Sequence, residues 1–406
     1  MGKLLMFNLF KEDEYIEKIY SYQDDNRYES IRCLLVDAAK KTFTGDIWKS
    51  EIAYLLAKDE NPFSLACERK GMITGSLYNI ALKDIEEIRN IYNFDKYTSD
   101  SVVLKEIKNF MLPKGTKKLL VAKHISRLVV ELDKAKTNEE FLNVLVKFYR
   151  NHGVGKIGIY HAFKLANGEL KPINEMVDYD LSKLVGYEWQ KKALIDNTEA
   201  FIKGLPANNC LLYGDAGTGK STSIKAINAM YYSKGLRVIE LYKHQMDELI
   251  PLIEKIRNRN YKFVLFMDDL SFEENETEYK YLKTVIEGGA EAMPKNVVIY
   301  ATSNRRHLVK EMWSDRNDMN EEIHKSDTMQ EKLSLVSRFG LTINFPSPTH
   351  NEYHDIVLGL AHRYSNISLS DEELIKMADR WALQHGEKSG RVAQQYIDLL
   401  LGGGTV

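Results

Sequence analysis

Cysteine is scarce in this chain of 406 residues. The three cysteines, Cys33, Cys67 and Cys210, lie far apart and form no CxxC pair. This spacing argues against a zinc ribbon and against a disulfide framework. We therefore expect a protein of the reducing cytoplasm.

A strong net charge and long apolar runs are also missing. The 56 Lys and Arg residues nearly balance 58 Asp and Glu residues, so the chain has no overall attraction to nucleic acid or acidic membranes. No segment approaches the roughly 20 apolar residues of a membrane helix, and the apolar stretch at residues 1–10 is too short to span a bilayer. With 44% hydrophobic residues, the composition predicts a soluble, folded protein without a membrane partner.

The sequence pattern divides the chain into four parts. Residues 1–150 have apolar side chains at helical spacing and predict a mainly helical N-terminal domain of unknown role. Residues 151–180 contain short β-prone runs around an Asn-Gly pair at 167–168, which predicts a β-hairpin and linker. From 181 to 346 strands alternate with helices, as is typical of a parallel α/β sheet. Residues 347–406 predict a small helical lid.

Five strands are expected in the α/β part. Strands and helical patterns follow one another along this part, and such alternation is typical of parallel strands joined by helices. The expected strands lie at residues 208–214, 236–242, 262–269, 296–304 and 341–346.

A glycine-rich loop follows the first of these strands. Its sequence, GDAGTGKS, satisfies the pattern GxxxxGK(S/T) between a strand and a helix. The loop N–H groups and the helix N-terminus would bind phosphates, Lys220 would reach the β and γ phosphates, and Ser221 would ligate Mg²⁺. The alternative is a glycine-rich turn without a ligand. The expected phosphate-binding residues are Gly214, Asp215, Ala216, Gly217, Thr218, Gly219, Lys220, Ser221 and Thr222.

Two adjacent acids end the third expected strand. In P-loop proteins a carboxylate at the end of a neighbouring strand holds Mg²⁺, and we expect Asp268 in that role. In an extended strand the next residue, Asp269, points to the other side, where it would polarise the attacking water. A solvated strand end is the alternative interpretation of Asp269.

The order of these motifs resembles the AAA+ ATPases over residues 181–400. GDAGTGKS resembles Walker A and VLFMDD resembles Walker B, although most active members have Glu where this chain has Asp269. The polar residue that ends the fourth strand, Asn304, matches the sensor-1 position, which orients the attacking water. The segment expected to pack on the adenine comprises Val185, Gly186 and Tyr187.

Two arginines extend the resemblance. The segment SLVSRFGL, residues 334–341, resembles an arginine-finger segment, in which Arg338 would stabilise γ-phosphate charge across a subunit interface. The segment KSGRVAQQY, residues 388–396, resembles the sensor-2 start of a lid helix, with Arg391 acting in cis. A surface charge is the alternative for each arginine. A finger acting in trans implies an ATP-promoted homo-oligomer.

The residues in and around these motifs resemble still more closely an uncharacterised bacterial family known as domain of unknown function 815. The segments that carry this resemblance are NNCLLYGDAGTGKS, MDDLSFE, EGG, YATSNRRHL and SRFGL. Its members resemble stand-alone AAA+ ATPases with an N-terminal region of unknown role. The resemblance implies a Mg²⁺-dependent ATPase that remodels or loads a macromolecular partner, protein or nucleic acid. The shorter Asp269 leaves a slow, nucleotide-gated loader or adaptor as the alternative. A P-loop kinase for small molecules is disfavoured by Asn304, Arg338 and the lid carrying Arg391.

Two further patterns leave alternatives open. His350 and His354 could share a metal ion on a helix, but Glu352 is not placed as in HExxH, so we favour polar faces of a lid helix. Arg305 and Arg306 directly follow the fourth strand. Binding to nucleic acid and contact with a neighbouring subunit's nucleotide are the alternative interpretations of this pair.

Overall fold

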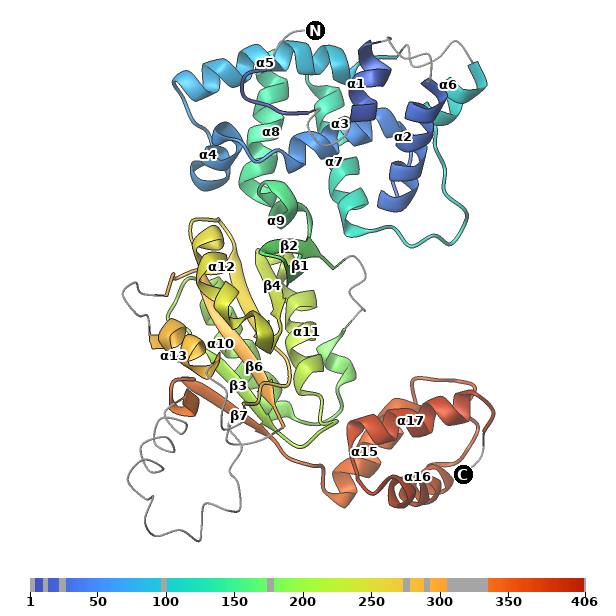
Figure 1. Ribbon diagram of the computed structural model, residues 1–406. Helices are drawn as coiled ribbons and strands as arrows, with labels where there is room; N and C mark the ends of the chain where they lie inside the picture. The colour runs from blue at the N-terminus through green and yellow to red at the C-terminus, as the bar shows by residue number, and fades with distance from the viewer. Residues whose placement is uncertain are drawn as a thin grey trace. The chain divides into compact units, whose positions relative to one another are not determined.

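The computed structural model describes residues 4–9, 14–21, 27–95, 101–173, 179–272, 278–287, 293–304 and 335–404 (Figure 1). The chain divides into two compact units, Met1–His161 and Ala162–Val406. The hairpin expected within the linker thus belongs to the second unit.

The first unit is helical, which confirms the mainly helical N-terminal region. Its central helix, α3, is buried along nearly its whole length, and Trp48 within it donates its indole N–H to the carbonyl of Ile91 at 2.8 Å. This bond satisfies a polar group that would otherwise be costly to bury. The helices are α1 (Glu14–Ser21), α2 (Arg27–Lys41), α3 (Ile47–Lys58), α4 (Pro62–Lys70), α5 (Ser76–Tyr92), α6 (Ser101–Lys108), α7 (Leu120–Lys134), α8 (Asn138–His152) and α9 (Gly155–Ile159).

The second unit contains a seven-stranded sheet in the order β2-β1-β4-β5-β6-β3-β7. All five predicted strands are present and run parallel. The sheet is wider than predicted because β1 pairs with β4 in parallel and β2 pairs with β1 in antiparallel. The strands are β1 (Ala162–Ala166), β2 (Glu169–Pro172), β3 (Cys210–Gly214), β4 (Leu236–Leu241), β5 (Lys262–Met267), β6 (Val297–Ser303) and β7 (Leu341–Phe345).

The predicted hairpin turn is confirmed. Asn167 and Gly168 join β1 to β2 with φ of 54° and 71°, as the favoured two-residue hairpin turn requires. The Gly168 N–H also donates to Glu248 Oε2 at 2.7 Å. Because β2 is the outermost strand, this hairpin forms one edge of the sheet.

The strand order brings the functional segments to one edge. β3 lies between β6 and β7, and β6 lies between β3 and β5. Parallel strands end on the same side, so the loops after β3, β5 and β6 meet there, where α/β sheets usually bind ligands. The helices of this region are η1 (Leu181–Lys183), α10 (Glu188–Ile202), α11 (Lys220–Tyr231), η2 (Tyr232–Lys234), η3 (Lys243–Glu248), α12 (Leu249–Ile256) and α13 (Glu278–Glu287).

Three helices end the chain, which confirms the predicted helical lid. They are α15 (His350–Ala361), α16 (Asp371–His385) and α17 (Gly390–Leu401), and they share a core that includes Tyr353 and Tyr396. Thr349 and Ser370 cap α15 and α16 with reciprocal capping boxes. Along the described part of the chain, no helix has the length and apolar composition that crossing a membrane requires.

Candidate functional site

The phosphate loop joins β3 to α11, as its sequence predicts. Crowding requires glycine at two of its positions. A Cβ at Gly214, whose φ is 133°, would lie 2.1 Å from the carbonyl oxygen of Phe345. At Gly219, where φ is 92°, a Cβ would lie 2.5 Å from a methyl group of Leu184. The loop therefore fits tightly against both the end of β7 and the segment before α10.

Lys220 folds back over the loop that precedes it. Its ammonium group donates to the carbonyl of Gly214 at 2.9 Å and to that of Asp215 at 2.6 Å. The residue is buried, and burial lowers the pKa of the Lys220 ammonium, although nearby acids oppose this shift. A buried cation at a helix N-terminus is well suited to a polyphosphate chain.

Three side chains converge on the end of β5. The hydroxyl groups of Ser221 and Thr302 donate to the same oxygen of Asp268, at 2.5 Å and 2.6 Å. Hydroxyl and carboxylate oxygens are the donors that Mg²⁺ prefers, so Ser221 and Asp268 fit the metal role predicted for them. Thr302 was not among the site residues expected from the sequence. Its signal was a hydroxyl residue near the end of a strand that is otherwise largely apolar.

Asp269 adopts a backbone conformation that the sequence did not predict. β5 ends at Met267, and Asp269 has a left-handed φ of 53°. Strand alternation therefore does not apply, and the expectation that the two acids point to opposite sides was wrong: Asp268 and Asp269 line the same cavity. Left-handed backbone is uncommon outside glycine, although Asp tolerates it better than most residues.

Polar contacts hold Asp269 in this conformation. Its N–H donates to the Thr302 hydroxyl at 2.9 Å, and its carboxylate accepts from the Asn304 amide at 2.8 Å. Because the Thr302 hydroxyl also donates to Asp268, one side chain from β6 positions both acids. Asp269 and Asn304 are thus direct partners.

A cavity of about 710 Å³ collects most of the predicted residues. Such a volume suits a small-molecule ligand. The predicted residues that line it are Val185, Tyr187, Gly217, Thr218, Gly219, Lys220, Ser221, Thr222, Asp268, Asp269, Asn304 and Arg391. Those that do not line it are Gly186, Gly214, Asp215, Ala216 and Arg338.

The lid closes over the loop through the start of α17. The Arg391 N–H donates to the carbonyl of Gly217 at 3.2 Å. A Cβ at Gly217 would lie 2.8 Å from the Ser389 hydroxyl oxygen, so the two segments nearly touch. Arg363 binds the other wall of the cavity by donating to the carbonyl of Lys183 at 2.5 Å. The lid therefore contributes two arginines, Arg363 and Arg391, to the lining of the cavity.

The segment expected to contact adenine lies along two neighbouring hollows. Tyr187 stacks on Phe345 with ring centroids 5.2 Å apart and donates its hydroxyl to the carbonyl of Pro346. Burial raises the pKa of Tyr187 to about 12. Val185 packs close to Gly359 of α15. All three residues of the segment, Val185, Gly186 and Tyr187, line a neighbouring hollow of about 410 Å³, whereas only Val185 and Tyr187 also line the larger cavity.

Asp215 has a partner outside the cavity. Its carboxylate accepts from the backbone N–H of Ser347 at 2.9 Å and from the Ser347 hydroxyl at 2.7 Å. These bonds lower the pKa of Asp215. The residue thus ties the phosphate loop to the segment that leads into the lid.

Arg338 lies away from the cavity of its own chain. It forms an ion pair with Glu287, the last residue of α13. Arg305 and Arg306 lie outside the described residues. Further cavity residues were not expected from the sequence. Gly390, Gln394 and Gln395 lie within the segment 388–396 that carries Arg391. The others come from loops or from the lid: Tyr179, Asp180, Lys183, Leu184, Ile356, Leu360 and Arg363.

Several solved structures resemble part of this chain at low sequence identity. RuvB from Thermotoga maritima, described as a Holliday junction branch migration motor, is 17% identical with a TM-score of 0.34, over 55% of this chain and 73% of that one. A point mutant of the same RuvB is also 17% identical, with a TM-score of 0.39, over 56% and 68%. No curated protein matches the chain.

A family model gives the more extensive match. The sheet, the loop between β3 and α11 and the C-terminal helices agree with the α/β core and helical lid expected from the sequence. The model described as "Protein of unknown function (DUF815)" matches residues 158–404. Because this match spans more than half of the sequence, the chain belongs to the DUF815 family.

Proposed function

We propose that this protein binds ATP with Mg²⁺, hydrolyses it to ADP and phosphate, and uses the cycle to remodel or load a macromolecular partner. One observation carries the proposal. A buried Lys220 in a phosphate loop lines the same cavity as the Ser221–Asp268 pair and the Asp269–Asn304 pair. Groups suited to bind phosphate, to hold Mg²⁺ and to position the attacking water thus line one cavity of this chain.

Each part of the cavity has a distinct task in this proposal. The loop N–H groups and Lys220 bind the phosphate chain, and Arg391 adds positive charge from the lid. Ser221 and Asp268 hold Mg²⁺, which when bound neutralises charge on the phosphates. Tyr187 and Val185 provide an apolar wall for the adenine ring of ATP. The chain's own contribution is mainly positioning and electrostatic stabilisation.

The attacking water is assigned to Asp269 and Asn304. The Asn304 amide donates to one oxygen of Asp269, which leaves the other carboxylate oxygen to accept a proton from water. General-base catalysis of this kind contributes about 10²–10⁴-fold to a rate. Asp is shorter than the Glu of most active AAA+ members, so a slow, nucleotide-gated loader or adaptor is our second candidate function.

The first test measures the reaction itself. We expect the purified full chain to release phosphate from ATP in the presence of Mg²⁺, with ADP as the other product, and we expect excess EDTA to stop this release. A protein that neither binds ATP nor releases phosphate, while remaining folded by circular dichroism, would contradict the proposal.

A second test concerns the expected trans role of Arg338. Arg338→Ala should retain ATP binding and lose turnover by at least about 10²-fold, because an arginine finger acts on developing γ-phosphate charge. Mixing this variant with Lys220→Ala should restore turnover. In a randomly mixed oligomer, about a quarter of the interfaces combine an intact Lys220 with an intact neighbouring Arg338.

Glu287→Ala provides the matched control for that experiment. It removes the ion-pair partner of Arg338 and leaves the guanidinium in place, so turnover should persist. If the mixture is no more active than the sum of its components, Arg338 does not act in trans. Light scattering with a non-hydrolysable ATP analogue should show self-association.

We also propose a cytoplasmic location. Cys33, Cys67 and Cys210 are all unpaired, which suits a reducing compartment. The class of partner, protein or nucleic acid, is best identified by affinity capture with a variant that binds ATP without hydrolysing it.

A further inference from the structure

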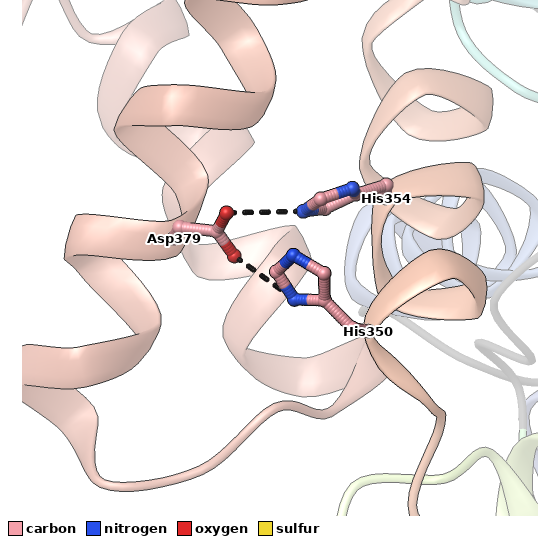
Figure 2. Close-up of side chains that lie close together, drawn as sticks. All are labelled: His350, His354 and Asp379. Carbon is pink, nitrogen blue, oxygen red and sulfur yellow. Dashed lines mark hydrogen bonds and ion pairs between the residues drawn. The ribbon is translucent and has the colours of Figure 1, made fainter.

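The lid carries a cluster of potential metal ligands that does not line the nucleotide cavity (Figure 2). His350 and His354 project from the first turns of α15 toward Asp379 of α16. His354 Nε2 lies 3.1 Å from Asp379 Oδ2, and His350 Nδ1 lies 3.6 Å from Asp379 Oδ1. The three candidate ligand atoms lie within 4.8 Å of one another.

These separations suit a tetrahedral metal ion. With metal–nitrogen and metal–oxygen bonds of about 2.0–2.1 Å, two ligands of a tetrahedral zinc site lie about 3.3 Å apart. The two nitrogen–oxygen distances, 3.1 Å to Asp379 Oδ2 and 3.6 Å to Asp379 Oδ1, lie on either side of that value. Small rotations of two imidazole rings, whose centroids are 4.1 Å apart, would therefore complete the geometry.

The helices that present the ligands are held in place by the lid core. Thr349 caps α15 directly before His350. Between the two histidines, Tyr353 is fully buried, and its hydroxyl donates to the carbonyl of Ala378, next to Asp379. This bond fixes the register of α15 against α16. Ligands on rigid, packed helices form better metal sites than ligands on loops.

A lysine already places positive charge in the cluster. The Lys388 ammonium contacts His350 Nδ1 and lies 3.3 Å from Asp379 Oδ1. That Asp379 oxygen is buried and has no hydrogen-bond partner among the described residues. The Lys388 side chain is 32% exposed and belongs to the short connection between α16 and α17, so it can turn toward solvent. The cluster thus attracts positive charge, and the Lys388 ammonium that now occupies it can be displaced by a metal ion.

We propose that His350, His354 and Asp379 form a binding site for a divalent transition-metal ion of the class that includes Zn²⁺ and Ni²⁺. Two imidazoles and one carboxylate favour such ions over Mg²⁺, which prefers oxygen ligands. Water supplies the remaining coordination. Metal binding displaces Lys388 and cross-links α15 to α16. The site lies beside Ser389 and Arg391, which pack on the phosphate loop, but it involves no group of the proposed catalytic set.

The test measures metal affinity in the full chain after removal of metal by chelation. We expect Zn²⁺ to bind in competition with a chromogenic chelator and Co²⁺ to give the visible absorption of a low-symmetry site. His350→Ala and His354→Ala should each weaken this binding at least about tenfold, as the loss of a ligand implies. Lys388→Ala should strengthen it, because a competing cation is removed.

His362→Ala is the matched control. His362 is an exposed histidine of the same lid, paired with Asp371 instead of Asp379, and its replacement should leave metal affinity unchanged. His350 is itself 56% exposed, so His350→Ala decides the question even if His354→Ala disturbs folding. Metal affinity that is unchanged in His350→Ala, or unchanged or weakened in Lys388→Ala, would overturn the proposal.

Discussion

Replacement of Lys220 by Ala is expected to abolish measurable ATP binding. The Lys220 ammonium donates hydrogen bonds to the carbonyl oxygens of Gly214 and Asp215, at 2.9 Å and 2.6 Å. Charged hydrogen bonds contribute about 1.5–3 kcal/mol each, so losing two to a phosphate chain weakens binding by roughly 10²-fold or more. The bared carbonyl oxygens of Gly214 and Asp215 would in addition repel the phosphates. Calorimetric titration with ATP measures the effect.

Lys192→Ala is the matched control for that variant. Lys192 lies on α10, its side chain is 74% exposed, and it pairs only with Asp196 among the described residues. Its replacement removes the same charge without touching the cavity, so ATP affinity should not change. Equal ATP affinity in Lys220→Ala and wild type would show that the loop does not bind phosphates, and both candidate functions would then fail.

The strand, loop and helix around GDAGTGKS could be predicted from the sequence because their determinants are local. A strand, a glycine-rich loop and a helix follow one another without interruption, and the chemistry of Lys220 and Ser221 depends on that succession. The position of Asp268 was predictable for the same reason, since it directly follows the buried strand β5. The hairpin turn at 167–168 was equally local.

The missing parts depend on contacts between distant segments. The pairing of β1 with β4 joins residues more than seventy positions apart, and no turn signal specifies it. Thr302 acts on Asp268 and Asp269 across two neighbouring strands, so its role appears only once β5 and β6 are paired. The third candidate metal ligand, Asp379, lies 25 positions beyond His354. A pattern search along the chain does not connect such residues.

Replacement of Asp269 by Asn is expected to separate binding from turnover. Asn tolerates left-handed backbone as Asp does, so the φ of 53° is retained at little cost. The substituted amide still accepts from Asn304 and no longer takes a proton from water. ATP affinity should stay within about twofold of wild type, while turnover falls about 10²–10⁴-fold. If turnover is unchanged, Asp269 is not the group that activates the water.

Asp269→Glu then distinguishes the two candidate functions, an ATPase motor that remodels its partner and a slow, nucleotide-gated switch that acts as a loader or adaptor. If the protein is slow because Asp269 falls short of the water, the extra methylene should raise turnover, since errors near 1 Å can cost about a hundredfold. The left-handed backbone at this position can also destabilise the variant, because Glu is less tolerant of positive φ than Asp. Thermal unfolding of both variants must therefore accompany the rates. A stable Glu variant that hydrolyses ATP no faster than wild type would count against the switch and favour a motor adapted to Asp269, positioned by Thr302 and Asn304.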